Sequence, residues 1–397
     1  MNTINAYPCR QTKPLWSSLA LAALTTVASS SVFAGATFKI DDTKWVSVGA
    51  GLRSSFTANE NAAPNGTDYS NDFNLDNIRL YLNGQIHKYI KVEFNTDCQT
   101  CGNGGEVRVL DAIGKFEFNP YVNLWVGRML VPAERREMNG PFYSPIYNVF
   151  ANGTPFEPAD QNLVIKNDGT SAGSYGRDDG ATLWGAAFDG RLQYAFGFFR
   201  GLRGGANNND NILFAQRVAY NFWEVEKNPG YYTSGTYYGT GGDIFTVGVA
   251  NIYQKQGAGT VANPANFRGT SVDVLLEKVL PGKGVVTLNG EYKNYGVDGN
   301  TLPVTMAPGP AGNFGLFQGN AIDVSAMYLF PQKVGIGKLQ PYGRYVNNMA
   351  VHSPDQDVFE GGMNYVIDGH NARVALSYQR YLANDLNGMT LGFQWQI

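Results

Sequence analysis

Short stretches in which apolar and polar residues alternate recur along most of the chain. Residues 73–86 (FNLDNIRLYLNGQI) show the pattern clearly, with Ile78, Leu80 and Leu82 on one face and Arg79 and Asn83 on the other. Successive side chains of a β-strand point to opposite faces, so a period of two predicts a strand with one apolar and one polar face. The same period recurs in residues 90–95, 106–118, 285–295, 372–381 and 388–397. These stretches are typical of amphipathic strands of roughly ten residues.

Sixteen such strands are expected along the chain. Their centres lie near residues 48, 80, 92, 112, 125, 185, 195, 217, 249, 274, 290, 325, 343, 362, 376 and 393. Tight turns such as NPY, DGR and DGHN alternate with longer polar connections, although residues 224–243 and 331–338 are longer than their neighbours at the short-turn end. The alternation slips at Val109–Leu110, which predicts a β-bulge. An even strand number places both termini at the short-turn end.

Residues 131–180 break this pattern, because they show no sustained period of two or of 3.6. Long connections are uncommon in compact domains, and this one contains too many apolar residues to be freely solvated. We therefore expect it to fold inside a ring of strands. The predicted fold is all-β: a sixteen-stranded antiparallel transmembrane β-barrel with a long infolded third loop. A secreted β-sandwich or β-helix is the alternative, but it would not need so many aromatic residues at strand ends.

The first 34 residues have the features of a secretory signal peptide. Arg10 and Lys13 precede an apolar stretch at residues 15–28, and Val32 and Ala34 are the small pair before the expected cleavage point. An N-terminal membrane anchor is the alternative, which the short apolar stretch disfavours. The predicted domains are a signal peptide (residues 1–34) and a barrel (residues 35–397). No later run of 18 apolar residues exists, so a closed barrel is the remaining way for an exported chain to cross a membrane.

Charge in the predicted mature chain is nearly balanced. Residues 35–397 carry 28 basic residues (30 − 2) and 33 acidic ones, a net charge of −5, which does not indicate a nucleic-acid partner. The alternation predicts equal numbers of basic and acidic side chains on the inner face. The basic ones are Arg79, Lys91, Lys115, Arg191, Arg217, Lys293, Arg344 and Arg373, and the acidic ones are Glu93, Asp111, Glu117, Asp273, Glu277, Glu291, Asp323 and Glu360.

Residues 131–180 would set the width and local field of such a barrel, because charged groups select the sign of a permeant ion and diameter selects its size. The candidates for the narrowest point are Arg135, Arg136, Tyr143 and Tyr147. In the alternative interpretation, the two arginines pair with Glu134, Glu137 or wall carboxylates and only anchor the loop.

Two of the three cysteines and all three histidines complete the candidate chemistry, since Cys9 lies in the predicted signal peptide. Cys98 and Cys101 form a CQTC motif, for which an oxidising compartment favours a local disulfide over free thiols or a metal site. His87, His352 and His370 fall in separate predicted turns and loops, so no Ser–His arrangement can be placed on one surface. We expect no catalytic site, no metal and no cofactor.

Three stretches carry a resemblance to a known family. They are residues 122–143 (VNLWVGRMLVPAERREMNGPFY), 220–234 (YNFWEVEKNPGYYTS) and 361–379 (GGMNYVIDGHNARVALSYQ). The sequence resembles the phosphate-selective porin O and P family of Gram-negative bacteria. The resemblance implies a homotrimer of sixteen-stranded barrels with the third loop inside. Phosphate-selective members line the lumen with arginines, and the mixed lining here departs from that, which indicates a non-phosphate-specific member.

These features predict an outer-membrane porin that allows passive diffusion of small hydrophilic solutes or ions through a water-filled lumen narrowed by residues 131–180. Its expected partners are outer-membrane lipid, these solutes and two further copies of the chain. The first alternative is a plugged barrel that acts as a surface receptor or adhesin. A barrel that encloses a periplasmic redox partner ranks last, because the chain has no haem-attachment motif.

Overall fold

The computed structural model describes residues 35–99, 101, 105–149, 176–201, 206–259, 261–298, 319–350 and 355–397. These residues belong to one compact unit, which is described below. The predicted signal peptide, residues 150–175 of the predicted third loop, and His352 lie outside the described residues.

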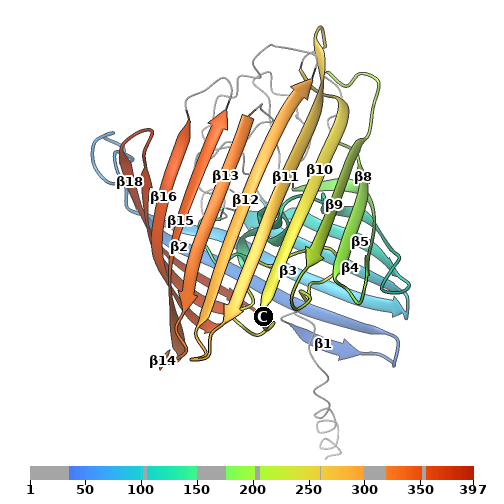
Figure 1. Cartoon of the computed structure of the whole chain (residues 1–397), viewed down its shortest axis with the longest axis horizontal. Coiled ribbons are helices and arrows are strands. Elements are labelled where there is room, and N and C mark those ends of the chain that lie inside the picture. Colours follow the sequence, from blue (N-terminus) through green and yellow to red (C-terminus); the bar gives the residue numbers. More distant parts are fainter. Residues whose placement is uncertain are drawn as a thin grey trace, which may run out of the picture. The chain divides into compact units, whose positions relative to one another are not determined.

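Sixteen long strands form a closed antiparallel barrel (Figure 1). They are β2 (Trp45–Asn59), β3 (Asp72–His87), β4 (Ile90–Gln99), β5 (Arg108–Glu117), β6 (Asn123–Leu130), β7 (Arg177–Ala187), β8 (Leu192–Phe199), β9 (Leu213–Asn221), β10 (Ile244–Gly259), β11 (Pro264–Val279), β12 (Val285–Asp298), β13 (Gly319–Leu329), β15 (Gly337–Ala350), β16 (Gln356–Asp368), β17 (Ala372–Tyr381) and β18 (Leu386–Gln396). The ring closes where β18 pairs with β2, with Gln394 opposite Arg53. Two short strands pair with the first residues of long strands. They are β1 (Ala36–Lys39), which pairs with β2, and β14 (Lys333–Val334), which pairs with β15. The predicted fold class is confirmed, and each of the sixteen predicted strand centres falls within a different long strand.

The predicted bulge is also confirmed. In the pairing of β4 with β5, Asn95 lies opposite Asp111 and Thr96 lies opposite Val109, which leaves Leu110 as the extra residue. Leu110 and Asp111 are consequently buried side by side instead of alternating.

Burial in the strands is the reverse of that in a water-soluble sheet. Along β9, Ala215 and Arg217 are 3% and 4% exposed, whereas Phe214 and Val218 are 45% and 41% exposed. The inner face therefore carries polar and charged groups that are covered, and the outer face carries bare apolar side chains. A sheet that closes on itself with an apolar exterior suits a hydrocarbon environment.

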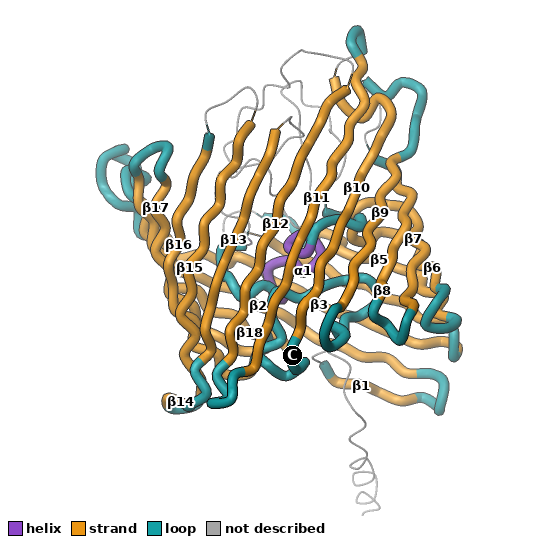
Figure 2. Tube along the Cα trace, in the orientation of Figure 1, coloured by secondary structure: helices purple, strands orange, loops and turns teal. Residues whose placement is uncertain are grey.

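The described residues contain one helix, α1 (Arg135–Tyr143), which lies inside the barrel (Figure 2). It is kinked at Gly140, whose φ of 58° is in the left-handed region that glycine adopts without strain, and Pro141 follows immediately. In the part of the chain that the structure describes, no helix is long and apolar enough to cross a membrane.

Candidate functional site: the occupied lumen

The helix α1 crosses the lumen from one wall to the opposite one. At its start, Arg135 lies 3.3 Å from a carboxylate oxygen of Asp273 on β11. Near its end, the ring of Phe142 lies 4.7 Å from the guanidinium of Arg79 on β3. In the closed ring, β3 and β11 are eight strands apart, which is half of the circumference. The two ends of α1 and their side chains therefore contact opposite walls of the barrel.

Arg135 is held in a buried cluster of four charges. It donates hydrogen bonds of 2.8 and 2.7 Å to the two carboxylate oxygens of Glu226, and Arg217 makes an ion pair with Asp273. Burial alone would raise the pKa of Glu226, but the charge and hydrogen bonds of Arg135 outweigh it and hold the pKa at about 2. Burial would likewise lower the pKa of Arg135, and the carboxylate of Glu226 raises it above its ordinary value. Arg135 and Glu226 are thus both ionised at neutral pH.

Arg136 is bound to the wall on the same side of the lumen. Its backbone N–H donates a 2.6 Å hydrogen bond to Glu291 Oε1 on β12, and its guanidinium forms an ion pair with Asp323 on β13. Arg344 on β15 shares Asp323 at 2.6 Å and also donates to the carbonyl of Asn148 at 2.9 Å. Arg135 and Arg136 are only 1% and 8% exposed. Their geometry is that of anchors between the loop and wall carboxylates.

The two candidate tyrosines occupy different positions. Tyr147 is buried, its hydroxyl donates to Asp76 Oδ2 at 2.6 Å, and the guanidinium of Arg53 lies 4.1 Å from its ring centre. Tyr143 is half-buried and lines a cavity, with its ring centre 5.3 Å from that of His370. Tyr147 is not among the residues that line this cavity.

The inward charges of the wall are brought together as pairs across neighbouring strands or with the loop. These pairs are Arg79–Asp97, Lys91–Glu117, Lys115–Glu93, Arg177–Asp111, Arg217–Asp273, Lys293–Glu134, Arg344–Asp323 and Arg344–Glu360. Arg373 donates to Gln394 Oε1 at 3.1 Å. Arg191 is placed differently from the prediction. It precedes β8, is exposed, and donates to the carbonyls of residues 221–223 at the short-turn end.

Several buried lumen groups were not among the predicted site residues. The alternation of β2 should have identified Arg53, because Val46, Val48 and Leu52 point outward. Arg177 is the first residue of β7 and lies within the range 131–180 that is predicted to be loop. Glu226 had no such signal, because nothing in its neighbourhood is periodic.

Glu226 belongs to a second segment inside the barrel. Residues 222–243, here called the second insert, connect β9 to β10 at the short-turn end. Their middle part reaches the inner wall. Tyr231 lies 5.2 Å from the ring of Trp125 on β6, Asn289 on β12 donates to the carbonyl of Gly235 at 2.9 Å, and Glu277 on β11 accepts from Thr236 Oγ1 at 2.7 Å. The described part of the third loop, residues 131–149, is here called the first insert.

A cavity of about 430 Å³ remains between the two inserts and the wall. Its lining reaches Lys333 and Lys338, so it extends to the short-turn end. His370, in the turn between β16 and β17, borders this cavity and lies within 3.0 Å of the carbonyl of Thr236. Burial, and then the charge of Arg373, lower the pKa of His370 to about 3, so the ring is neutral at physiological pH.

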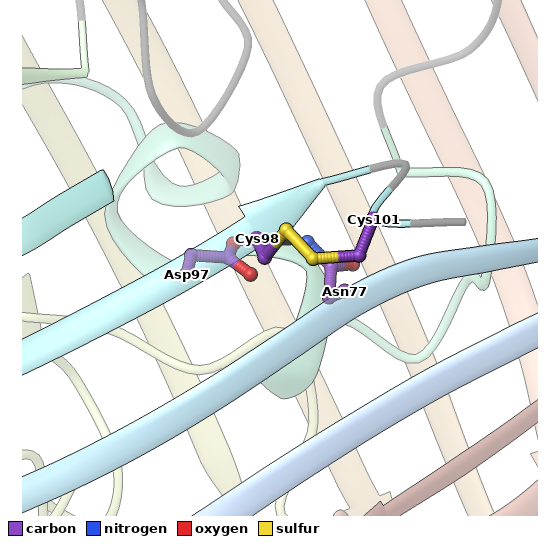
Figure 3. The surroundings of a disulfide bond; sticks show 4 residues. All are labelled: Asn77, Asp97, Cys98 and Cys101. Atoms are coloured by element: carbon purple, nitrogen blue, oxygen red, sulfur yellow. Dashed lines mark hydrogen bonds between the residues drawn. A yellow bond between two sulfur atoms is a disulfide. The ribbon is translucent and has the colours of Figure 1, made fainter. Parts of the chain in front are cut away.

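A disulfide joins Cys98 to Cys101 at the long-loop end of β4 (Figure 3). The neighbouring Asp97 is fully buried, accepts a 2.9 Å hydrogen bond from Asn77 and pairs with Arg79 at 3.1 Å. The bridge therefore lies at the end of a strand whose inward carboxylate anchors a lumen arginine. Among the described residues, no group of three or more His, Cys, Asp or Glu side chains is arranged to hold a metal ion.

Comparisons with known proteins support the fold but no family. No family model matches the sequence, and no curated protein matches it. Solved structures do match. An anion-selective porin from Comamonas acidovorans superposes with a TM-score of 0.56 at 11% identity, covering 89% of this chain and 100% of that one. OmpT of Vibrio cholerae gives 0.54 at 14% identity, covering 91% and 100%. OmpF of Salmonella typhi, solved with daunomycin, gives 0.53 at 12%, covering 91% and 100%. The chain shares the sixteen-stranded porin fold of these proteins.

Proposed function

We propose that this chain is an outer-membrane porin through which small hydrophilic solutes or ions diffuse passively. Residues 131–180 narrow the water-filled lumen, and residues 1–34 direct export to the cell outer membrane. The observation that carries the proposal is a closed barrel with bare apolar side chains outside, charged side chains inside, and a helix across its lumen.

The inner lining supports conduction without strong selectivity for one ion sign. Basic and acidic groups are paired on both sides of α1, so no single sign of charge dominates the wall. Charged rings choose the sign of a permeant ion, and here the two signs largely offset each other. The similarity in fold to porins agrees with a diffusion channel and does not bear on its ion selectivity.

The test is the current through a planar lipid bilayer containing protein refolded without residues 1–34. We expect stepwise conductance increases and, in a KCl gradient, a small zero-current potential. A large potential of either sign would contradict the balanced lining, and absence of any current would refute passive diffusion.

The burial of the lumen charges favours a second candidate, a plugged barrel that acts as a surface receptor or adhesin. Arg135, Arg217, Arg344 and Arg373 are all 4% exposed or less, so each is covered by protein. Such a barrel would carry no current and would bind a ligand through its long loops. The same bilayer experiment separates the two candidates.

Membership of the phosphate-selective porin O and P family, as a non-phosphate-specific member, is part of the proposal and rests on the three resembling stretches. Membership of this family implies that the chain assembles as a homotrimer. Chemical crosslinking in detergent, read as the mass of the largest discrete species, tests the trimer directly.

A further inference from the structure

We infer that the lumen is narrowed from both ends, and that the second insert, residues 222–243, supplies the solute-selecting half nearest the short turns. This inference deepens the proposed function and rests on it. It assigns selection to Tyr237 and its neighbours, in addition to the third loop.

The two inserts form one unit through main-chain contacts. The backbone N–H of Thr233 donates to the carbonyl of Met138 at 3.3 Å, and that of Gly235 donates to the carbonyl of Tyr143 at 3.0 Å. A Cβ added to Gly235 would lie 2.5 Å from Cδ of Pro145, so this approach requires glycine. The second insert is therefore seated against α1 along its own backbone.

A carboxylate of the wall fixes the second insert independently of α1. Glu277 on β11 is fully buried and accepts hydrogen bonds from the backbone N–H groups of Tyr237 at 3.0 Å and Gly239 at 2.7 Å, as well as from Thr236. Charge-assisted hydrogen bonds of this kind are strong when they are buried. The insert is held on two sides, as a selecting element must be if its side chains are to keep a defined position.

The side chains that face the remaining space come from both inserts. Tyr232, Tyr237 and Tyr238 of the second insert and Tyr143 of the first are half-buried and line the 430 Å³ cavity. The hydroxyl of Tyr237 donates to Glu226 Oε2 at 2.7 Å, which ties the ring to the buried charge cluster. A solute that uses this cavity contacts both inserts, so both determine which solutes fit.

The first test replaces residues 228–239 with a short Gly-Ser linker, leaving Glu226 and the paired strands β9 and β10 intact. We expect single-channel conductance to rise about twofold or more and larger polyethylene glycols to enter, because pore width sets both quantities. The matched control replaces part of residues 60–71, a largely exposed loop at the opposite end, and should leave conductance unchanged.

A second test avoids deletion. Tyr237→Cys is compared with Tyr220→Cys, an outward position that is 37% exposed on β9. A charged methanethiosulfonate reagent should change the current only in the Tyr237→Cys variant, since the native Cys98 and Cys101 are joined to each other.

The outcomes separate this inference from the proposed function. If the intact chain conducts and neither the deletion nor the modification alters its current, the inference is overturned and the porin proposal stands. If the intact chain is silent and the deletion conducts, passive diffusion in the intact chain is refuted, and control of the lumen by the second insert is supported. If neither conducts, both are overturned.

Discussion

The pair formed by Arg135 and Glu226 offers a quantitative test of how the inserts are held. Arg135, Arg217, Glu226 and Asp273 form a buried cluster whose charges cancel. Arg135→Met leaves this cluster with a net charge of −1, and Glu226→Gln leaves it with +1. The double variant is neutral again, with Arg217 and Asp273 still paired.

Each single substitution should be costly and the double one much less so. Removing one partner of a buried ion pair costs about 3–5 kcal/mol, because a charge is left without compensation. The free energy of unfolding of the double variant should therefore exceed the additive expectation by about 2–3 kcal/mol, at the upper end of the coupling seen between contacting residues.

The assay is equilibrium urea unfolding of the refolded protein in detergent micelles, followed by tryptophan fluorescence, for all four members of the cycle. Trp125 lies 5.2 Å from Tyr231 of the second insert and so reports on the region concerned. Losses that simply add in the double variant would refute the view that the two inserts are joined through this cluster.

Three further predictions concern single sites. Because the pKa of His370 is lowered from 6.5 to about 3, the unfolded chain binds a proton in that range that the folded chain does not. The contribution of His370 to stability should therefore fall as pH decreases below 6.5, by about 1.4 kcal/mol per pH unit, and His370→Asn should remove that contribution in urea titrations between pH 6.5 and 4.5. Lys227→Glu should change the zero-current potential in the direction of greater cation selectivity, since the exposed Lys227 lines the cavity. Replacing both Cys98 and Cys101 with serine should lower the free energy of unfolding by about 2 kcal/mol, because the unfolded chain regains the entropy lost by closing a four-residue loop. The current should be unchanged.

Matched controls accompany these variants. His87→Asn changes an exposed histidine and should keep the pH slope, and Lys283→Glu changes an exposed turn lysine away from the cavity and should keep the potential. The histidine titration stops at pH 4.5 because of Glu226, whose pKa is lowered from 4.5 to about 2. Below pH 4.5 the stabilising contribution of Glu226 is also lost, which would add a second slope. The first prediction is contradicted if His370→Asn leaves the pH slope unchanged. The second is contradicted if Lys227→Glu leaves the zero-current potential unchanged, and the third if loss of the disulfide alters the current.

The barrel could be predicted from the sequence because its strands follow a local rule. Ile78, Leu80 and Leu82 alternate with polar residues, and a period of two is visible within ten residues of chain. The same rule found the bulge at Leu110, where one extra residue shifts the phase. It misplaced Arg191, since it extended the alternation of β8 one residue beyond the strand, which begins at Leu192.

The interior of the lumen could not be predicted in the same way, because it depends on contacts between distant residues. The connection formed by residues 224–243 is unusually long for its end of the barrel, yet its tyrosines and glycines suit an exposed turn equally well. They are held inside by the ion pair of Glu226 with Arg135, 91 residues away, and by the hydrogen bonds of Glu277 with the backbone of Tyr237 and Gly239. Similarly, the sequence offered Arg135 and Arg136 both as pore-facing groups and as anchors, and only the positions of Asp273 and Asp323 distinguish these roles.

The arrangement of the two inserts also bears on the order in which the barrel assembles. The contacts between the inserts join residues 135–145 to residues 226–235, all between β6 and β10, so they can form while the sheet is still open. The contacts of the first insert with Arg53 and Gln394 involve the strands that meet at the seam. Pairing across that seam spans most of the chain, and such long-range pairing is intrinsically slow. The two inserts would then dock on each other first and serve as an internal template around which β18 finally meets β2.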